Sequence, residues 1–239
     1  MVNVGSKIVN NWIYPIDNGY VLIDTGYENG FAHLRKKLAK HNIDLHQIRY
    51  IFLTHAHDDH AGYLNEILSE CPAAQVVMSN RALEVLYRGQ NSFHGGCTTK
   101  TALCFCILMK IIGKGKHLFP KLKQEYQCRC IQISDQNRTQ VELLLQGKII
   151  DTPGHTADSI SLLLNSGSLF CGDAAMNGLP SLHRVTIWVE DKTAFLQSWE
   201  TIIALSPKKI YPGHGKPFKC DELIANYNRA KNMKLLQLH

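Results

Sequence analysis

The chain has 239 residues, of which 45% are apolar and 19% charged, and its formal net charge is +6. This length and composition are typical of one globular domain, with or without an insertion. No apolar run reaches the roughly 18–20 residues that a membrane-spanning helix needs. Residues 1–11 contain one lysine and no apolar stretch of the signal-peptide kind, so we expect a cytoplasmic protein.

Short strands and helices alternate in the first third of the chain. The periodicity predicts, in order, a hairpin over residues 8–24 turning at Asn18-Gly19, a helix over 31–41, a buried strand over 50–53, a helix over 61–70, a strand over 75–78 and a helix over 81–88. Alternation of this kind indicates an α/β protein.

The last third is richer in strand signals. We expect strands over residues 131–134, 139–145, 148–151, 159–164 and 168–171, a helix over 193–204, a strand over 208–211, and a closing helix over 221–236 capped by Asp221. A long loop over residues 174–190 lies between the strand predicted to end at residue 171 and the helix predicted to begin at residue 193. No linker divides the chain, so we interpret residues 1–239 as a single domain.

Residues 88–131 interrupt the alternation and are interpreted as a basic, apolar helical insertion. The segment carries eight Lys or Arg residues and one acidic residue, Glu125, so it holds the whole excess of positive charge. Its apolar run over residues 102–109 is too short to span a bilayer and suits a helix partly buried against the domain. Three interpretations stay open: a packed lid with solvated lysines, a lid selecting an anionic or amphipathic substrate, and contact with a membrane surface or nucleic acid.

The sequence THAHDDH at residues 54–60 follows the predicted strand over 50–53. Buried histidine and aspartate are costly unless each is hydrogen-bonded or bound to a metal. Neutral imidazole and ionised carboxylate are good ligands of zinc and related divalent ions. We therefore interpret this loop as part of a metal site.

Three further polar positions also follow predicted strands, within the sequences DTPGH (residues 151–155), CGD (171–173) and YPGHG (211–215). Strand ends of this kind can bring side chains together at one edge of a sheet. Seven candidate ligands result: His55, His57, Asp59, His60, His155, Asp173 and His214. Seven exceed the need of one tetrahedral zinc ion but suit two metal ions sharing a carboxylate.

These motifs and their order resemble the metallo-β-lactamase superfamily of binuclear hydrolases, from the strand end at residues 22–26 to His214. The resemblance implies a four-layer αββα sandwich. It also implies that His55, His57 and His155 hold one metal ion, that Asp59, His60 and His214 hold the other, and that Asp173 bridges them. Asp24 is similar to an aspartate that supports the metal-site histidines without binding metal.

The ligand set predicts hydrolysis, because two divalent ions lower the pKa of a shared water so that hydroxide forms near neutral pH. Zinc fits the ligand types best, and iron or manganese would also fit. Asp59 is the candidate catalytic residue, orienting the hydroxide and shuttling its proton. We expect its neighbour Asp58 to point away and to cap the following helix.

The predicted reaction is cleavage of an ester-like bond in a carboxylic ester, lactone, thioester or phosphoester of a small, anionic or amphipathic substrate. An aspartate at position 173 disfavours a true β-lactamase, since those branches usually carry Cys or Ser there. Met176 stands where the lactone-hydrolase branch often has a tyrosine. His57 argues against the redox diiron branch, which usually has glutamate at that position.

His183 and Arg184, in the loop over residues 174–190, are candidate contacts for a substrate anion. The alternative function is a phosphodiesterase or nuclease that uses the basic insertion against phosphates, although the segment lacks the aromatic pattern of RNA-binding modules. A non-catalytic binding module is disfavoured by the intact ligand set. The sequence gives neither the substrate nor the oligomeric state.

Overall fold

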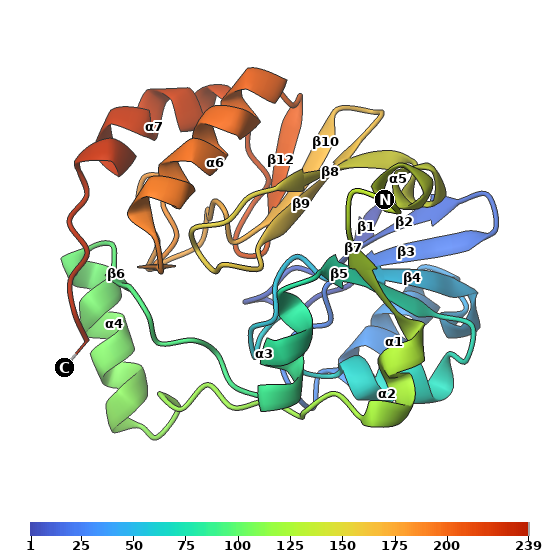
Figure 1. The fold of residues 1–239 in the computed structure, drawn as a ribbon. Coiled ribbons are helices and arrows are strands. Elements are labelled where there is room, and N and C mark those ends of the chain that lie inside the picture. The colour runs from blue at the N-terminus through green and yellow to red at the C-terminus, as the bar shows by residue number, and fades with distance from the viewer. Residues whose placement is uncertain (239) are drawn as a thin grey trace. The chain divides into compact units, whose positions relative to one another are not determined.

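The computed structural model describes residues 1–238 and divides the chain into two compact units (Figure 1). The first unit comprises residues 1–91 and 118–147, and the second comprises residues 92–117 and those from 148 onward. Each unit combines a sheet with helices, so the predicted α/β class is confirmed.

The first unit is built on a six-stranded sheet with the order β1-β2-β3-β4-β5-β7. Its strands are β1 (Val2–Asn3), β2 (Trp12–Ile16), β3 (Gly19–Ile23), β4 (Ile48–Phe52), β5 (Gln75–Ser79) and β7 (Cys130–Ile133). β2 and β3 form the predicted hairpin, and β3, β4, β5 and β7 run parallel. The carboxyl ends of β3 and β4 therefore lie side by side.

Helices pack against this sheet. The helical elements of the first unit are α1 (Phe31–Lys40), η1 (Leu45–Gln47), α2 (Leu64–Glu70), α3 (Ala82–Arg88), η2 (Gln124–Arg129) and α5 (Arg138–Leu145). Leu34 and Leu38 of α1, one turn apart, are buried in the same core cluster as Ile51 of β4 and Val76 of β5. Burial of each such side chain stabilises the unit by about 1.5–3 kcal/mol.

The second unit has a four-stranded sheet with the order β12-β10-β9-β8 and a two-stranded sheet of β11 and β6. Its strands are β6 (Gly96–Cys97), β8 (Gly147–Asp151), β9 (Ile160–Leu164), β10 (Ser168–Gly172), β11 (Trp188–Val189) and β12 (Lys209–Pro212), and its helices are α4 (Lys100–Ile111), α6 (Lys192–Leu205) and α7 (Asp221–Asn232). Phe195 and Trp199 of α6 and Leu223 of α7 pack with Leu169 of β10. β10 and β12 run parallel, so their carboxyl ends also meet.

Three sequence predictions need correction. Residues 139–145, predicted as a strand, form α5, in which Val141 and Leu145 are buried one turn apart while Leu143 is 75% exposed. The helix predicted over residues 61–70 begins only at Leu64, because the Gly62 amide donates to the Gly26 carbonyl at 2.8 Å and holds the preceding turn. Asp221 does not cap α7, whose capping position is Cys220 and has no side-chain hydrogen bond.

The basic segment over residues 88–131 contributes to both units: residues 92–117 carry β6 and α4 of the second unit, and residues 118–131 carry η2 and part of β7 of the first. Its interpretation as an inserted lid stays a prediction. Among the helices of residues 1–238, none combines the length and apolar character that crossing a bilayer requires.

Candidate metal centre

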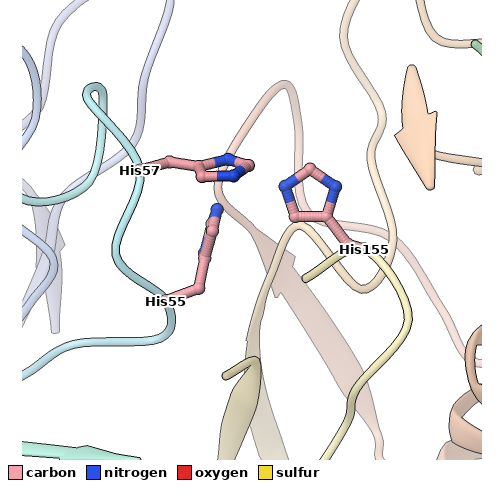
Figure 2. Close-up of side chains that lie close together, drawn as sticks. All are labelled: His55, His57 and His155. Atoms are coloured by element: carbon pink, nitrogen blue, oxygen red, sulfur yellow. The ribbon is translucent and has the colours of Figure 1, made fainter. Parts of the chain in front are cut away.

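Four of the seven predicted ligands lie in the loop that follows β4, and we call His55, His57, Asp59 and His60 the first-unit cluster. The rings of His55 and His57 meet edge to face with centroids 4.6 Å apart (Figure 2). The centroids of His55 and His60 are 4.1 Å apart. All four side chains are buried, so their polar atoms lie where water cannot fully solvate them.

Asp24 follows β3 and orients two histidines of this cluster, His60 directly and His55 through Thr54. Its Oδ2 accepts a hydrogen bond from His60 Nδ1 at 2.8 Å. The same oxygen accepts from the Thr54 hydroxyl at 2.8 Å, and Oδ1 accepts from the Thr54 amide at 2.7 Å. Asp24 is itself buried and has a φ of 57°, a strained conformation that the loop must stabilise.

These contacts fix the tautomer of both neutral rings. His60 must carry its proton on Nδ1, because a carboxylate only accepts. The Thr54 hydroxyl donates its one proton to Asp24. Toward His55 Nδ1, 3.1 Å away, it is therefore the hydrogen-bond acceptor. In both histidines the lone pair is left on Nε2, the arrangement that metal-binding histidines show when their other nitrogen is hydrogen-bonded.

The other three predicted ligands follow β8, β10 and β12, and we call His155, Asp173 and His214 the second-unit cluster. Nε2 of His214 lies 3.5 Å from Asp173 Oδ2, and Nε2 of His155 lies 3.8 Å from the same oxygen. His155, also labelled in Figure 2, donates from Nδ1 to the Trp188 carbonyl at 2.8 Å, so its Nε2 carries the lone pair.

The separations inside each cluster fit metal ligands better than they fit hydrogen bonds. Within the first-unit cluster, Asp59 Oδ1 lies 3.7 Å from His60 Nε2. Distances of 3.5–3.8 Å exceed the usual hydrogen-bond range. Two ligand atoms on one tetrahedral zinc ion lie about 3.4 Å apart when each bond is about 2.1 Å long. The donor chemistry and the spacing therefore fit divalent metal ions.

Asp58 does not cap α2, so that expectation is wrong. Its carboxylate accepts from Asn91 Nδ2 at 2.7 Å, and its amide donates to Asn91 Oδ1 at 2.8 Å. α2 begins at Leu64, too far along the chain for Asp58 to reach its first turn. This reciprocal pair of hydrogen bonds connects the loop over residues 54–60 to Asn91, which follows α3.

The two predicted substrate contacts have protein partners in the second unit. The Arg184 guanidinium donates to Glu222 of α7, with Nε 2.9 Å from Oε2, and it lies over the Phe218 ring. The exposed His183 ring lies 2.8 Å from an Arg229 nitrogen. Both residues have positive φ angles, which places them at a tight bend. Their role toward a substrate stays a prediction.

Sequence reasoning missed the roles of Thr54 and Trp188. Thr54 could have been noticed, because a hydroxyl directly before the first histidine can relay a hydrogen bond. Trp188 acts through its backbone carbonyl, which any residue would supply, so no signal in its side chain identifies it.

Residues 4–102 match the family model described as the metallo-beta-lactamase superfamily. The chain is 24% identical over 235 residues to the Beta-lactamase-like protein 2 homolog of Drosophila melanogaster, covering 95% of this chain and 67% of that protein. It is 26% identical over 233 residues to the homolog of the same name from Caenorhabditis elegans, covering 92% of this chain and 62% of that protein. The chain thus spans about two thirds of these relatives.

Several solved structures share the fold of this chain. An archaeal metallo-beta-lactamase superfamily protein, ST1585 from Sulfolobus tokodaii, matches with a TM-score of 0.60 and 20% identity over 98% of this chain and 84% of that one. TTHA1623, solved in a di-iron-bound form, matches with a TM-score of 0.64 and 19% identity over 94% and 96%. FIM-1 from Pseudomonas aeruginosa, solved in a mono-zinc form, matches with a TM-score of 0.61 and 19% identity over 93% and 83%. The resemblance predicted from the motifs is confirmed: this chain has the fold of the metallo-beta-lactamase superfamily and matches that family's model over residues 4–102.

Proposed function

We propose that the chain is a binuclear metal-dependent hydrolase of ester-like bonds. In this proposal His55, His57 and His155 bind one divalent ion, Asp59, His60 and His214 bind the other, and Asp173 bridges the two. The observation that carries the proposal is the hydrogen bonding of three of these histidines through Nδ1, which leaves Nε2 as the ligand atom in His55, His60 and His155.

The metal ions would lower the pKa of water and polarise a carbonyl or phosphoryl oxygen. The protein's own part is to position the ligands and to move a proton. Asp24 and Thr54 keep His55 and His60 in one tautomer, so no rotation or proton shift is needed when metal binds. A carboxylate oxygen of Asp59 would take the proton of the attacking water, the role that we assign to it as catalytic residue.

Zinc is our first choice of metal because five of the seven ligands are histidines, and iron or manganese would also suit a carboxylate-bridged pair. Two solved structures with this fold contain metals of these kinds: TTHA1623 was solved with two irons and FIM-1 with a single zinc. For the substrate we propose a small ester, lactone, thioester or phosphoester. Position 176 offers no hydroxyl for the leaving group, since Met176 is buried and its sulfur accepts a hydrogen bond from the Thr186 hydroxyl at 2.9 Å.

The test is a set of chromogenic substrates assayed with the full chain loaded separately with zinc, iron or manganese. The set contains carboxylic esters, lactones, thioesters, phosphodiesters and a cephalosporin. We expect turnover of at least one ester-like class and loss of that turnover in Asp59→Asn. Asp135→Asn changes an exposed aspartate in the turn between β7 and α5; it is the matched control and should keep full activity. Turnover of the cephalosporin alone, or equal activity in both variants, would contradict the proposal.

A further inference from the structure

The outward side of α4 is apolar, which is unusual for a helix on the surface. Ile107, Leu108 and Ile111 are 42%, 54% and 76% exposed, and Ile112 at the helix end is 55% exposed. Residues 104, 107, 108 and 111 follow the i, i+3, i+4, i+7 spacing, so they share one face. Ala102 lies on the opposite side by the same spacing and is the one residue of α4 that is buried. Figure 1 shows α4 as a separate helix at the edge of the drawn chain. We call the exposed set of Cys104, Ile107, Leu108, Ile111 and Ile112 the α4 apolar face.

The segment that carries this face is rich in lysine and contains no acidic residue. Residues 92–117 contain Lys100, Lys110, Lys114 and Lys116 and no Asp or Glu. Lys100 begins α4, Lys110 lies in its last turn, and the other two follow within the next five residues. The face is therefore apolar along its length and positively charged at both ends.

The helix is held in place before any partner arrives. The Thr99 hydroxyl accepts from the Ala102 amide at 3.0 Å and caps the first turn. The Thr98 hydroxyl donates to the Thr186 carbonyl at 2.6 Å, and β6 pairs with β11 just before the helix. A partner would thus meet a preformed face and would not have to supply the free energy of ordering it.

From this combination we propose that the α4 apolar face docks on an anionic membrane surface. Aliphatic side chains in the acyl boundary with lysines at headgroup level are the arrangement of interfacial helices. A helix of 12 residues is about 18 Å long and cannot cross a hydrocarbon core of about 30 Å, so it would lie in the surface. A symmetric contact with a second copy would bring the lysines of both copies together, which like-charge repulsion opposes.

The test is co-sedimentation of the full chain with vesicles of phosphatidylcholine alone or mixed with an equal part of phosphatidylglycerol. We expect binding to the mixed vesicles, weaker binding to the neutral ones, and a loss of binding as salt is raised. Ile111→Glu, and separately Lys110→Glu combined with Lys114→Glu, should each lower the partition coefficient by roughly tenfold or more.

Matched controls separate this surface from general effects of apolar area and charge. Leu143→Glu changes a 75% exposed leucine of α5, and Lys36→Glu with Lys40→Glu reverses two exposed lysines of α1. These variants should bind vesicles within about twofold of the unaltered chain. Hydrolysis of a soluble substrate should be equal in all five proteins, so membrane docking and catalysis are tested separately.

Two results would overturn the proposal. The first is no binding to mixed vesicles, or equal losses in the α4 variants and the controls. The second is a stable dimer in light-scattering measurements that Ile111→Glu converts to monomer, since the α4 apolar face would then be an interface between copies. Circular dichroism of each variant shows whether the chain keeps its overall secondary structure.

Discussion

At the residue scale, Asp24 is the side chain that holds the loop over residues 54–60 in place. Its two oxygens accept three hydrogen bonds, one from His60 and two from Thr54, and the Thr54 hydroxyl in turn accepts from His55. A carboxylate suits this position, because its three hydrogen-bond partners are all donors.

Asp24→Asn should therefore weaken metal binding with little change in shape. The amide has one accepting oxygen and one donating nitrogen, so at least one of the three donors loses its acceptor. We expect metal affinity to fall by roughly 10–100-fold, measured by competition with a chromophoric chelator. Asp44→Asn, at the exposed cap of η1, should leave the affinity unchanged. Equal affinities in the two variants would show that Asp24 does not support the ligands.

Arg129 lies in the basic segment over residues 88–131, but its hydrogen bonds stabilise the first unit. Its guanidinium donates to the carbonyls of Leu68 at 2.6 Å, Cys71 at 2.5 Å and Ala74 at 2.6 Å, and so closes the connection between α2 and β5. This role separates Arg129 from the lysines of residues 92–117.

Arg129→Met should lower the free energy of unfolding by about 3 kcal/mol, because the carbonyls lose charge-assisted hydrogen bonds. Urea denaturation measures the change. Lys123→Met removes a nearby exposed cation whose ion pair with Glu125 spans 3.8 Å, and it should cost less than about 0.5 kcal/mol. A small effect of Arg129→Met would mean that water replaces the guanidinium.

Cys71 gives a prediction about pH. Burial, with a smaller contribution from Glu70, raises the pKa of its thiol from about 9 to about 11, although Arg129 opposes the shift. The unfolded chain then loses this proton at a lower pH than the folded chain. The stabilisation from the protonated thiol is complete below pH 9 and is lost as the pH rises to about 11.

The contribution amounts to about 2–3 kcal/mol at its largest. In urea titrations, the stability advantage of the unaltered chain over Cys71→Ala should shrink as the pH rises from 9 to 11. Leu143→Ala supplies the control, since it changes an exposed side chain without a titrating group and its effect on stability should not vary with pH. A constant difference between the unaltered chain and Cys71→Ala would refute the assignment.

At the element scale, the strand ends that carry polar residues could be predicted from sequence, because a buried apolar run followed by a Pro-Gly turn or a histidine cluster is a local signal. β4, β8, β10 and β12 all fall where that signal placed them. α5 was mistaken for a strand because four apolar residues among polar ones fit both periods in a stretch of only eight residues.

The tautomer-fixing contacts could not be predicted in the same way. They join residues distant in sequence, such as Asp24 with His60 and His155 with the Trp188 carbonyl. Family resemblance pointed to Asp24, but only the parallel pairing of β3 with β4 explains why it reaches the loop.

Gly154 ties the His155 turn to α6 and cannot carry a side chain. Its φ is 128°, and a Cβ there would lie 2.3 Å from the backbone of Phe195. Its carbonyl also accepts from the amides of Glu190 and Asp191 at the start of α6. The turn and the start of α6 are therefore in direct contact.

Gly154→Ala should cost at least about 2 kcal/mol and should also lower metal content, because the turn that carries His155 must shift. Gly113→Ala is a control for backbone strain alone, since Gly113 has a φ of 79° with nothing within 4 Å of a Cβ. It should cost about 1 kcal/mol and leave metal content intact. Equal metal content in both variants, measured after dialysis, would show that His155 tolerates the shift or does not bind metal.

At the scale of the whole molecule, the seven proposed ligands are divided between the two units, with four in the first-unit cluster and three in the second-unit cluster. Metal bound to both clusters would stabilise the folded chain by linkage, since the unfolded chain does not present the ligands together. Chelation should therefore lower the melting temperature and make both units easier to digest with protease.

The most direct test of the dinuclear proposal is the metal-to-protein ratio of the purified full chain, determined by mass spectrometry of the elements after dialysis. We predict about two divalent ions per chain. The ratio should fall in His60→Ala and in Asp173→Asn, and it should be unchanged in His46→Ala, which removes an exposed histidine of η1. A chain that contains no transition metal and takes up none when zinc, iron or manganese is supplied would contradict the account.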